Sequence, residues 1–243
     1  MRPSITAPSS LQILSDGWNQ LANELTQRYG VVRGTRKFLA QLLRDQWFQN
    51  EIALVSSFGG EASVPLLLVS ALNRNLRVIF LETGYSFAET LAYRDVLTNR
   101  LQLSNVKTYE PTLAQSKRID PYGMPPICCD EVKVDMLSEA LRDYSIWISG
   151  RKRYQGEKRI DIPMVEIDGD KIKINPLALW SEAQVKSFMR RHHLPRHELS
   201  NKGYGSIGCA SCTVPGKGRS GRWPGINKSE CGIHGLEFDG SGI

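Results

Sequence analysis

Short apolar runs alternate with longer helical patterns through the middle of the chain. EIALVSS, RVIFLETG, NVKTYEP and SIWISG have the composition of strands, and helical spacing of apolar residues separates them. Strands joined through helices lie parallel in one sheet, with the helices covering its faces. We therefore predict an α/β fold with a parallel twisted sheet flanked by helices, in which ligands bind beyond the carboxyl ends of the strands.

Three regions differ in pattern, although we expect one structural domain. Residues 1–50 have apolar positions at threes and fours, which predicts a helical N-terminal cap over the sheet. Residues 51–200 carry the α/β pattern, with a hairpin at an Asp-Gly pair and a late helix capped by Ser181. Residues 201–243 are rich in glycine, which predicts irregular backbone and a mobile C-terminal segment.

Composition and charge exclude several classes of protein. The 243 residues are 41% hydrophobic, and no apolar run approaches the roughly twenty residues that span a bilayer. The start lacks the apolar segment of a secretory signal, so we expect a cytoplasmic protein with no membrane partner. The net charge of +6 favours an anionic partner. Because the basic residues are scattered, we expect a small anion and no nucleic acid.

The cysteines divide into a set of four and one that stands apart. Cys128 and Cys129 are adjacent, while Cys209 and Cys212 form a CxxC pair. Adjacent cysteines seldom form a disulfide with each other, and a CxxC turn can aim two thiolates at one metal or cluster. The spacing favours a structural zinc site and an iron–sulfur cluster about equally.

Cys231 lies in the sequence ECGIH, close to several basic residues. Arg219, Arg222 and Lys228 precede it and His234 follows, which is the kind of cationic setting in which reactive thiolates are found. We interpret Cys231 as a reactive thiolate, in preference to a buried inert thiol. Arg219 and Arg222 are three residues apart and could together bind a tetrahedral oxyanion.

The turn SSFGGE follows the first predicted strand and can offer backbone N–H groups to an anion. It matches neither GxxxxGK[ST] nor GxGxxG, and it only approximates SGGxDS, the pyrophosphate loop of enzymes that adenylylate substrates with ATP. Lys133 lies four residues beyond Cys129 on a predicted helix, where it could place a cation beside the metal site.

Together these motifs resemble those of the assimilatory adenylylsulfate (APS) reductases, iron–sulfur type, with the adenine-nucleotide alpha-hydrolase-like fold. The likeness covers about residues 50 to 235 and rests on SSFGGE, LETGYSFAET, ICCDEVKV, SGRKRYQ, KINPLALW, GYGSIGCASCT and RSGRWPGINKSECGIH. Glu82 departs from the family pattern, which is commonly LDTG. The resemblance implies a 4Fe-4S cluster with four cysteine ligands, which are Cys128, Cys129, Cys209 and Cys212.

The resemblance also implies a reaction, the reduction of APS to sulfite and AMP. Cys231 would attack the sulfate sulfur and form an S-sulfocysteine, from which thioredoxin or glutaredoxin releases sulfite. The residues expected to surround the sulfate are Lys133, Arg153, Arg219, Arg222 and His234. The residues expected to touch adenosine are Ser57, Phe58, Gly59, Leu81 and Gly84.

Three alternatives stay open on the sequence. The first is PAPS as substrate, alone or beside APS, with the same chemistry and an added 3′-phosphate. The second is an ATP-dependent tRNA-thiolating enzyme, which shares the sheet but should carry a proper SGGxDS loop. The third is a zinc module that binds nucleic acid without catalysis. The sequence also leaves open a homo-oligomer.

Overall fold

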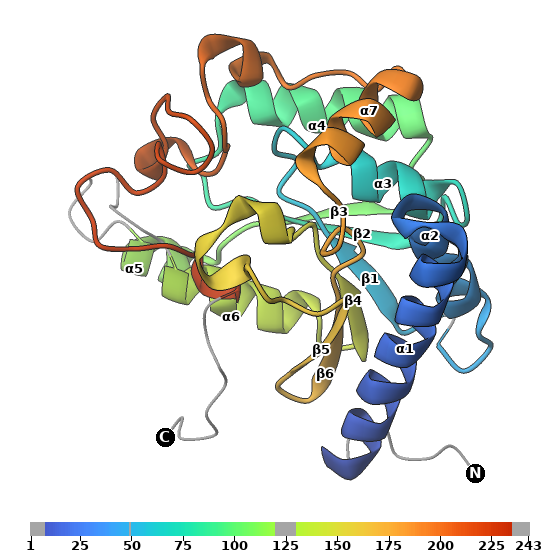
Figure 1. The fold of residues 1–243 in the computed structure, drawn as a ribbon. Helices are drawn as coiled ribbons and strands as arrows, with labels where there is room; N and C mark the ends of the chain where they lie inside the picture. The colour runs from blue at the N-terminus through green and yellow to red at the C-terminus, as the bar shows by residue number, and fades with distance from the viewer. Residues whose placement is uncertain (1–7, 49, 120–129, 235–243) are drawn as a thin grey trace.

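Six strands form a single sheet in the spatial order β3-β2-β1-β4-β6-β5. The computed structural model describes residues 8–48, 50–119 and 130–234, whose arrangement Figure 1 shows. The strands are β1 (Ile52–Val55), β2 (Arg77–Leu81), β3 (Val106–Tyr109), β4 (Ile146–Ile148), β5 (Val165–Asp168) and β6 (Lys171–Ile174). All neighbouring pairs are parallel except β5 with β6, which form the predicted hairpin. The predicted sheet is therefore confirmed, with one antiparallel strand at its edge.

The central strands are apolar on both faces because each contributes to two hydrophobic clusters. Side chains alternate along a strand, so Ile52 and Leu54 of β1 face one cluster while Ala53 faces the other. Trp147 of β4 joins Ala53 in the second cluster. Burial on both faces explains why these strands are continuous apolar runs in the sequence.

Helices cover both faces of the sheet. Figure 1 shows α3, α4 and α7 on one face and α5 and α6 on the other. The helices of the described residues are α1 (Pro8–Tyr29), α2 (Val31–Arg44), α3 (Ser63–Ser70), α4 (Ala88–Leu101), α5 (Leu113–Ile119), α6 (Asp130–Ala140) and α7 (Glu182–Arg191). Helix α5 was not predicted, because its seven residues are too few for a clear periodic pattern. None of these helices is both long and apolar enough to cross a membrane.

The predicted N-terminal cap is a pair of closely packed helices. A Cβ atom at Gly34 of α2 would lie 2.5 Å from Thr26 Cα of α1, so glycine permits the close approach of the two backbones. Helix α1 also packs against β5 and β6. There the Asn19 side-chain amide donates to the Val165 carbonyl oxygen (2.7 Å) and accepts from the Val165 N–H (3.0 Å). The pair therefore covers one end of the sheet.

Helix α7 begins at Ser181, as the sequence predicts. Ser181 Oγ accepts the Gln184 N–H at 3.2 Å, and the Gln184 side chain accepts the Ser181 N–H at 2.8 Å. These two bonds satisfy N–H groups that have no partner within the first helical turn. The capping box thus fixes where α7 starts.

The direction of the strand order changes at β1, and this change positions the site. From β1 the chain moves outward through β2 and β3, and it then returns to β4 on the other side of β1. In open α/β sheets such a point leaves a crevice beyond the carboxyl ends of the two central strands. The turns that follow β1 and β4 therefore flank one crevice.

Candidate active site

The turns after β1 and β4 form two walls of a cavity of about 880 Å³. The first turn contributes Ser56, Ser57 and residues 59 to 62, and the second contributes residues 150 to 152 with Gln155 and Arg159. A glycine-rich segment between Tyr204 and His234 lines a further side, and residues of α7, of the stretch that follows α7, and Lys133 of α6 complete the lining. A cavity of this volume accommodates a nucleotide-sized ligand.

The turn after β1 is anchored by a phenylalanine that faces the core. Phe58 has a φ of 47° and is fully buried, with its ring 5.4 Å from the Phe80 ring. Its N–H donates to Ser56 Oγ at 3.1 Å. On either side of this anchor, Ser57 and Gly59 face the cavity. The core contact therefore fixes a turn whose flanking residues are available to a ligand.

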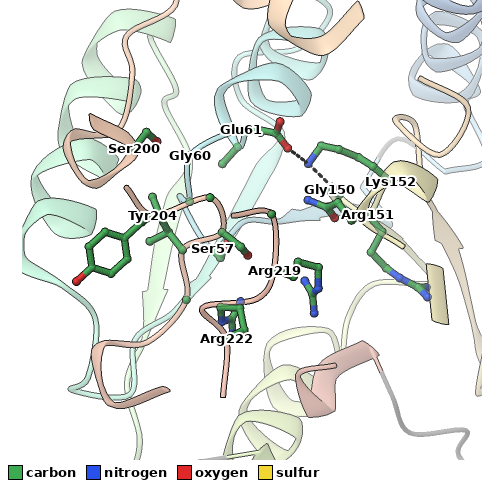
Figure 2. Close-up of a pocket in the computed structure, with 18 of the residues that line it drawn as sticks. Ser57, Gly60, Glu61, Gly150, Arg151, Lys152, Ser200, Tyr204, Arg219 and Arg222 are labelled. Atoms are coloured by element: carbon green, nitrogen blue, oxygen red, sulfur yellow. Dashed lines mark hydrogen bonds and ion pairs between the residues drawn. The ribbon is translucent and has the colours of Figure 1, made fainter. Parts of the chain in front are cut away.

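An ion pair joins the two turns. Lys152 Nζ lies 3.0 Å from Glu61 Oε2 and donates to the Gly150 carbonyl oxygen at 2.9 Å (Figure 2). The Tyr154 hydroxyl donates to Glu61 Oε1 at 2.8 Å. Burial would raise the pKa of Glu61, but the Lys152 charge and these hydrogen bonds outweigh it and hold that pKa below its ordinary value. Burial lowers the pKa of Lys152 and Glu61 opposes that change.

Two buried arginines extend the wall that follows β4. Arg151 is 6% exposed and its Nη1 donates to Glu166 Oε1 at 2.5 Å. Arg159 is 7% exposed and is ion-paired with Glu230 of the C-terminal segment. Both side chains line the cavity. They are held by carboxylates and do not depend on a ligand for their position.

The cavity lining is strongly cationic. Its carboxylates are Glu61 and Glu182, which pair with Lys152 and Lys186. The lysines and arginines of the lining are Lys133, Arg151, Lys152, Arg159, Lys186, Arg190, Arg196, Lys217, Arg219 and Arg222. Such a lining favours an anionic ligand.

Close backbone crossings fix the path of the C-terminal segment. The Gly205 N–H donates to the Gly216 carbonyl oxygen at 2.9 Å, and a Cβ at Gly205 would lie 2.5 Å from Gly218 N. A Cβ at Gly208 would lie 2.4 Å from the Arg222 guanidinium carbon. Glycine at these positions allows the chain to fold back on itself while Arg222 lies against it. The predicted irregular backbone is confirmed, and the mobility of this segment stays a prediction.

Arg219 and Arg222 lie over one buried aromatic ring. Their guanidinium carbons are 5.3 and 4.3 Å from the centre of the Trp223 ring. Arg219 Nη2 also donates to the Ser229 carbonyl oxygen at 2.6 Å. Figure 2 shows both arginines across the cavity from the Glu61–Lys152 pair. The predicted pair of arginines therefore comes together at one wall.

Cys231 lines the same cavity, followed in the chain by a stacked imidazole. The His234 ring lies parallel to the Trp147 ring, with centroids 6.0 Å apart. The backbone N–H of His234 donates to the Cys231 carbonyl oxygen at 2.9 Å. Burial, with the nearby charges of Lys173 and Arg159, lowers the pKa of His234 well below its ordinary value. Its imidazole is therefore neutral at pH 7.

Cys209 and Cys212 lie in the second hydrophobic cluster, next to α6. Cys212 Sγ is 3.7 Å from the Cys209 carbonyl oxygen, and Lys133 Nζ of α6 is 3.0 Å from Cys209 Sγ. A hydrogen bond with Cys209, together with burial, raises the pKa of the Cys212 thiol. The other two predicted cluster ligands, Cys128 and Cys129, lie outside the described residues. Within the described residues, no three His, Cys, Asp or Glu side chains form a group that could hold a metal.

The structure brings most of the predicted site residues to the cavity. Those that line it are Ser57, Gly59, Lys133, Cys209, Cys212, Arg219, Arg222, Cys231 and His234. Four predicted substrate contacts are not among its lining residues. These are Phe58, Leu81, Gly84 and Arg153.

Local geometry explains why these four residues do not line the cavity. The side chains of Phe58 and Leu81 point into the two hydrophobic clusters. Gly84 has a φ of 85° and forms a turn in which its N–H donates to Glu82 Oε1 at 2.7 Å, so Glu82 serves the turn. Arg153 Nε donates to the Ile162 carbonyl oxygen at 2.8 Å, so the side chain is engaged elsewhere.

Sequence reasoning missed several cavity residues. Arg151 and Lys152 stand directly before Arg153 in the turn SGRKRYQG, and their position just beyond the end of β4 was a usable signal. Arg159 and Glu230 are 71 residues apart in the chain, and their contact exists only in the folded protein. No sequence pattern could have paired them.

The six-stranded sheet with helices on both faces and the crevice beside β1 define an open α/β fold, and its cationic lining suits an anionic ligand. The chain belongs to the phosphoadenosine phosphosulfate reductase family, whose domain model matches residues 51–215. The resemblance stated from the motifs is thereby confirmed.

Individual relatives cover most of the chain. It is 44% identical to the adenosine 5′-phosphosulfate reductase of Mesorhizobium japonicum, over 78% of this chain and 79% of that protein. It is 33% identical to the phosphoadenosine 5′-phosphosulfate reductase of Gloeobacter violaceus, over 93% and 94% of the two chains. The crystal structure of phosphoadenylyl-sulfate (PAPS) reductase from Candida auris has the same fold, with a TM-score of 0.61, 23% identity, and coverage of 74% of this chain and 90% of that one.

Proposed function

We propose that the protein reduces adenylylsulfate to sulfite and AMP, with Cys231 as the nucleophile. The observation that carries this proposal is that Cys231 shares one cavity with Arg151, Arg159, Arg219 and Arg222. Sulfate oxygens repel an incoming thiolate, so this chemistry needs cations around the oxygens before the two sulfur atoms can meet. The name of the Mesorhizobium japonicum relative supports the same substrate.

The proposed reaction has two stages. In the first, the Cys231 thiolate attacks the sulfate sulfur, the new S–S bond forms, and AMP leaves with the electron pair of the broken S–O bond. In the second, a thiolate of thioredoxin, or of a glutaredoxin, attacks Cys231 Sγ and releases sulfite. The second thiol of the partner then resolves the mixed disulfide. The thiols of the partner supply both electrons. We place the reaction in the cytoplasm.

The cavity residues have distinct roles in this proposal. Ser57 and Gly59 contact the nucleotide, and the arginines of both walls stabilise charge on the sulfate oxygens. His234 is neutral, so it donates a hydrogen bond to a sulfate oxygen without adding a charge. Removing one donor of this kind typically lowers a rate by about 10² to 10³.

We further propose that Cys128, Cys129, Cys209 and Cys212 hold a 4Fe-4S cluster. Cys209 and Cys212 fit such a group, because their thiols are buried, close together and next to the ammonium group of Lys133. When bound, the cluster supplies a fixed anionic anchor. Lys133 lines the cavity and its Nζ lies 3.0 Å from Cys209 Sγ, so a bound cluster would hold this ammonium group beside the sulfate site.

A second candidate substrate is PAPS, which one observation favours. The lining contains Lys186, Arg190, Arg196 and Lys217, in addition to the arginines near Cys231. These cationic side chains could also bind a 3′-phosphate. The Gloeobacter violaceus relative carries the name of a phosphoadenosine 5′-phosphosulfate reductase.

The test offers APS and PAPS separately to the anaerobically purified holoenzyme with thioredoxin and measures sulfite. We expect sulfite from APS, and a sulfonate group on the Cys231 peptide by mass spectrometry when thioredoxin is left out. Cys231→Ser should abolish both signals while binding of AMP persists. Sulfite from PAPS alone would assign the second substrate, and sulfite release by Cys231→Ser would refute the mechanism.

A further inference from the structure

The residue before Cys231 is held by the most thoroughly buried ion pair of the C-terminal segment described. Glu230 is 6% exposed and Arg159 is 7% exposed. Arg159 Nε donates to Glu230 Oε1, and Arg159 Nη2 donates to Glu230 Oε2 at 2.6 Å. Two parallel bonds between a guanidinium and a carboxylate fix orientation as well as distance.

Arg159 is itself fixed on the wall that follows β4. Its Nη1 donates to Gln155 Oε1, and its own N–H donates to the Gly156 carbonyl oxygen at 3.1 Å. A side chain with both ends held in this way is a rigid anchor. The C-terminal segment is therefore attached at Glu230 to the β4 side of the cavity.

A second arginine contacts the same short stretch of chain. Arg219 Nη2 lies 3.4 Å from Glu230 Oε2 and donates to the Ser229 carbonyl oxygen at 2.6 Å. Burial would raise the pKa of Glu230, but its bonds to Arg159 and the charge of Arg219 outweigh it, so that pKa lies below the ordinary value. Glu230 is thus ionised at pH 7 and compensates two arginines that line the cavity.

The chain is also attached on the other side of Cys231. Three residues later, His234 stacks on Trp147 of β4. Cys231 therefore lies between two attachment points, and its sulfur cannot shift far without breaking one of them. A displacement of about 1 Å at a reacting centre can cost about 10²-fold in rate.

We propose that Glu230 is a positioning residue, which through Arg159 holds Cys231 at the cationic end of the cavity. This inference rests on the proposed function, because it assigns Glu230 a part in presenting the Cys231 nucleophile to the sulfate. Glu230 does not touch the substrate in this account. Its carboxylate, through the bonds to Arg159, fixes the position of Cys231.

The test compares Glu230→Gln and Arg159→Gln, alone and together, with the wild-type holoenzyme. Sulfonation of Cys231 by APS is measured in a single turnover without thioredoxin. AMP affinity and the rate of Cys231 alkylation by iodoacetamide are measured on the same samples. Glu24→Gln, an exposed glutamate on α1, is the matched control.

We expect Glu230→Gln to slow sulfonation about 10²-fold while it speeds alkylation, because a released Cys231 meets solvent more often and the sulfate less often. The double variant should be no slower than the slower single variant, since the two side chains act as one unit. Glu230→Asp, which keeps the charge, should recover part of the rate.

Three outcomes would overturn the inference. They are an unchanged sulfonation rate in Glu230→Gln, a fall in AMP affinity that accounts for the whole loss, and equal slowing of sulfonation and alkylation. Cys231→Ser, measured in parallel, separates the two proposals. If Cys231→Ser is inactive and Glu230→Gln is normal, the positioning role fails alone; if Cys231→Ser still releases sulfite, the proposed function fails.

Discussion

At the level of single residues, the sequence predicted which side chains carry the chemistry better than it predicted where those side chains point. Arg219, Arg222, Cys231 and His234 were singled out by their charge or reactivity, and all of them line the cavity. Arg153 was predicted from its motif position to surround the sulfate, but its Nε donates to the Ile162 carbonyl oxygen. In a turn without regular periodicity, the direction of a side chain depends on contacts that the sequence does not state. Similarly, a charged pair such as Arg159 and Glu230 arises only when distant segments meet.

The Glu61–Lys152 pair should stabilise the fold as well as the site. Lys152→Met leaves the Glu61 carboxylate without its main partner, which we expect to lower the free energy of unfolding by about 3 kcal/mol. The measurement is urea unfolding, with Lys117→Met as the control. Lys117 is exposed on α5, so its replacement should change stability by less than about 0.5 kcal/mol. Equal effects of the two substitutions would contradict the prediction.

The same pair gives a pH dependence. The folded-state pKa of Glu61 is below its ordinary value, so its contribution is fully present above the unfolded pKa, about 4.3. It is lost as pH falls through the lower folded pKa. The stability difference between wild type and Lys152→Met should therefore narrow on acidification below about pH 4.3, as measured by urea unfolding at several pH values. A difference that widens would exclude the ion pair as its cause.

At the level of helices and strands, the sequence was informative wherever periodicity was long. The four predicted parallel strands, the hairpin and the Ser181 cap are all present as predicted. The miss is α5, which is too short to show a period. How close two helices approach each other was also beyond the sequence. In the sequence, nothing distinguishes Gly34 from another glycine within a helix, and only the structure shows that α1 lies against it.

Two glycines in neighbouring helices give a matched experiment. A Cβ at Gly34 would lie 2.6 Å from the Leu25 carbonyl oxygen, whereas a Cβ at Gly17 of α1 would meet nothing within 4 Å. Gly34→Ala should therefore lower the free energy of unfolding by about 2 kcal/mol, through forced separation of α1 and α2. Gly17→Ala should raise it by about 0.5 to 1 kcal/mol, because alanine favours a helix interior. Thermal unfolding of both variants checks the opposite signs, and destabilisation by both would count against the close crossing.

At the level of the whole molecule, basic residues are concentrated around the cavity, where they can attract an anion. Ten lysines and arginines and two glutamates line the cavity at the crevice beside β1. The sequence predicted an anionic partner from the net charge, but scattered basic residues do not reveal where they gather. The change of direction in the strand order at β1 brings together the turns that carry these basic residues and the C-terminal segment. The alternation of strands and helices in the sequence does not state this strand order.

This concentration of charge predicts a dependence on ionic strength. Raising the salt concentration from about 0.05 M to 0.5 M should lower kcat/KM for APS roughly 3- to 10-fold, because salt screens the field that draws an anion into the cavity. The kcat at saturating APS should change little, since the bound sulfate is shielded from bulk ions. Steady-state kinetics at several salt concentrations measures both, with sucrose as a control for viscosity. A kcat/KM independent of salt would contradict the prediction.

The amide of Asn19 has a consequence for behaviour at high concentration. A β-strand at the margin of a sheet normally leaves backbone groups that can recruit a strand from another molecule. Here the Asn19 side chain bonds both the N–H and the carbonyl oxygen of Val165, in the way that a further strand would. Helix α1 thereby occupies the β5 edge at Val165, where a strand from a second molecule would otherwise pair.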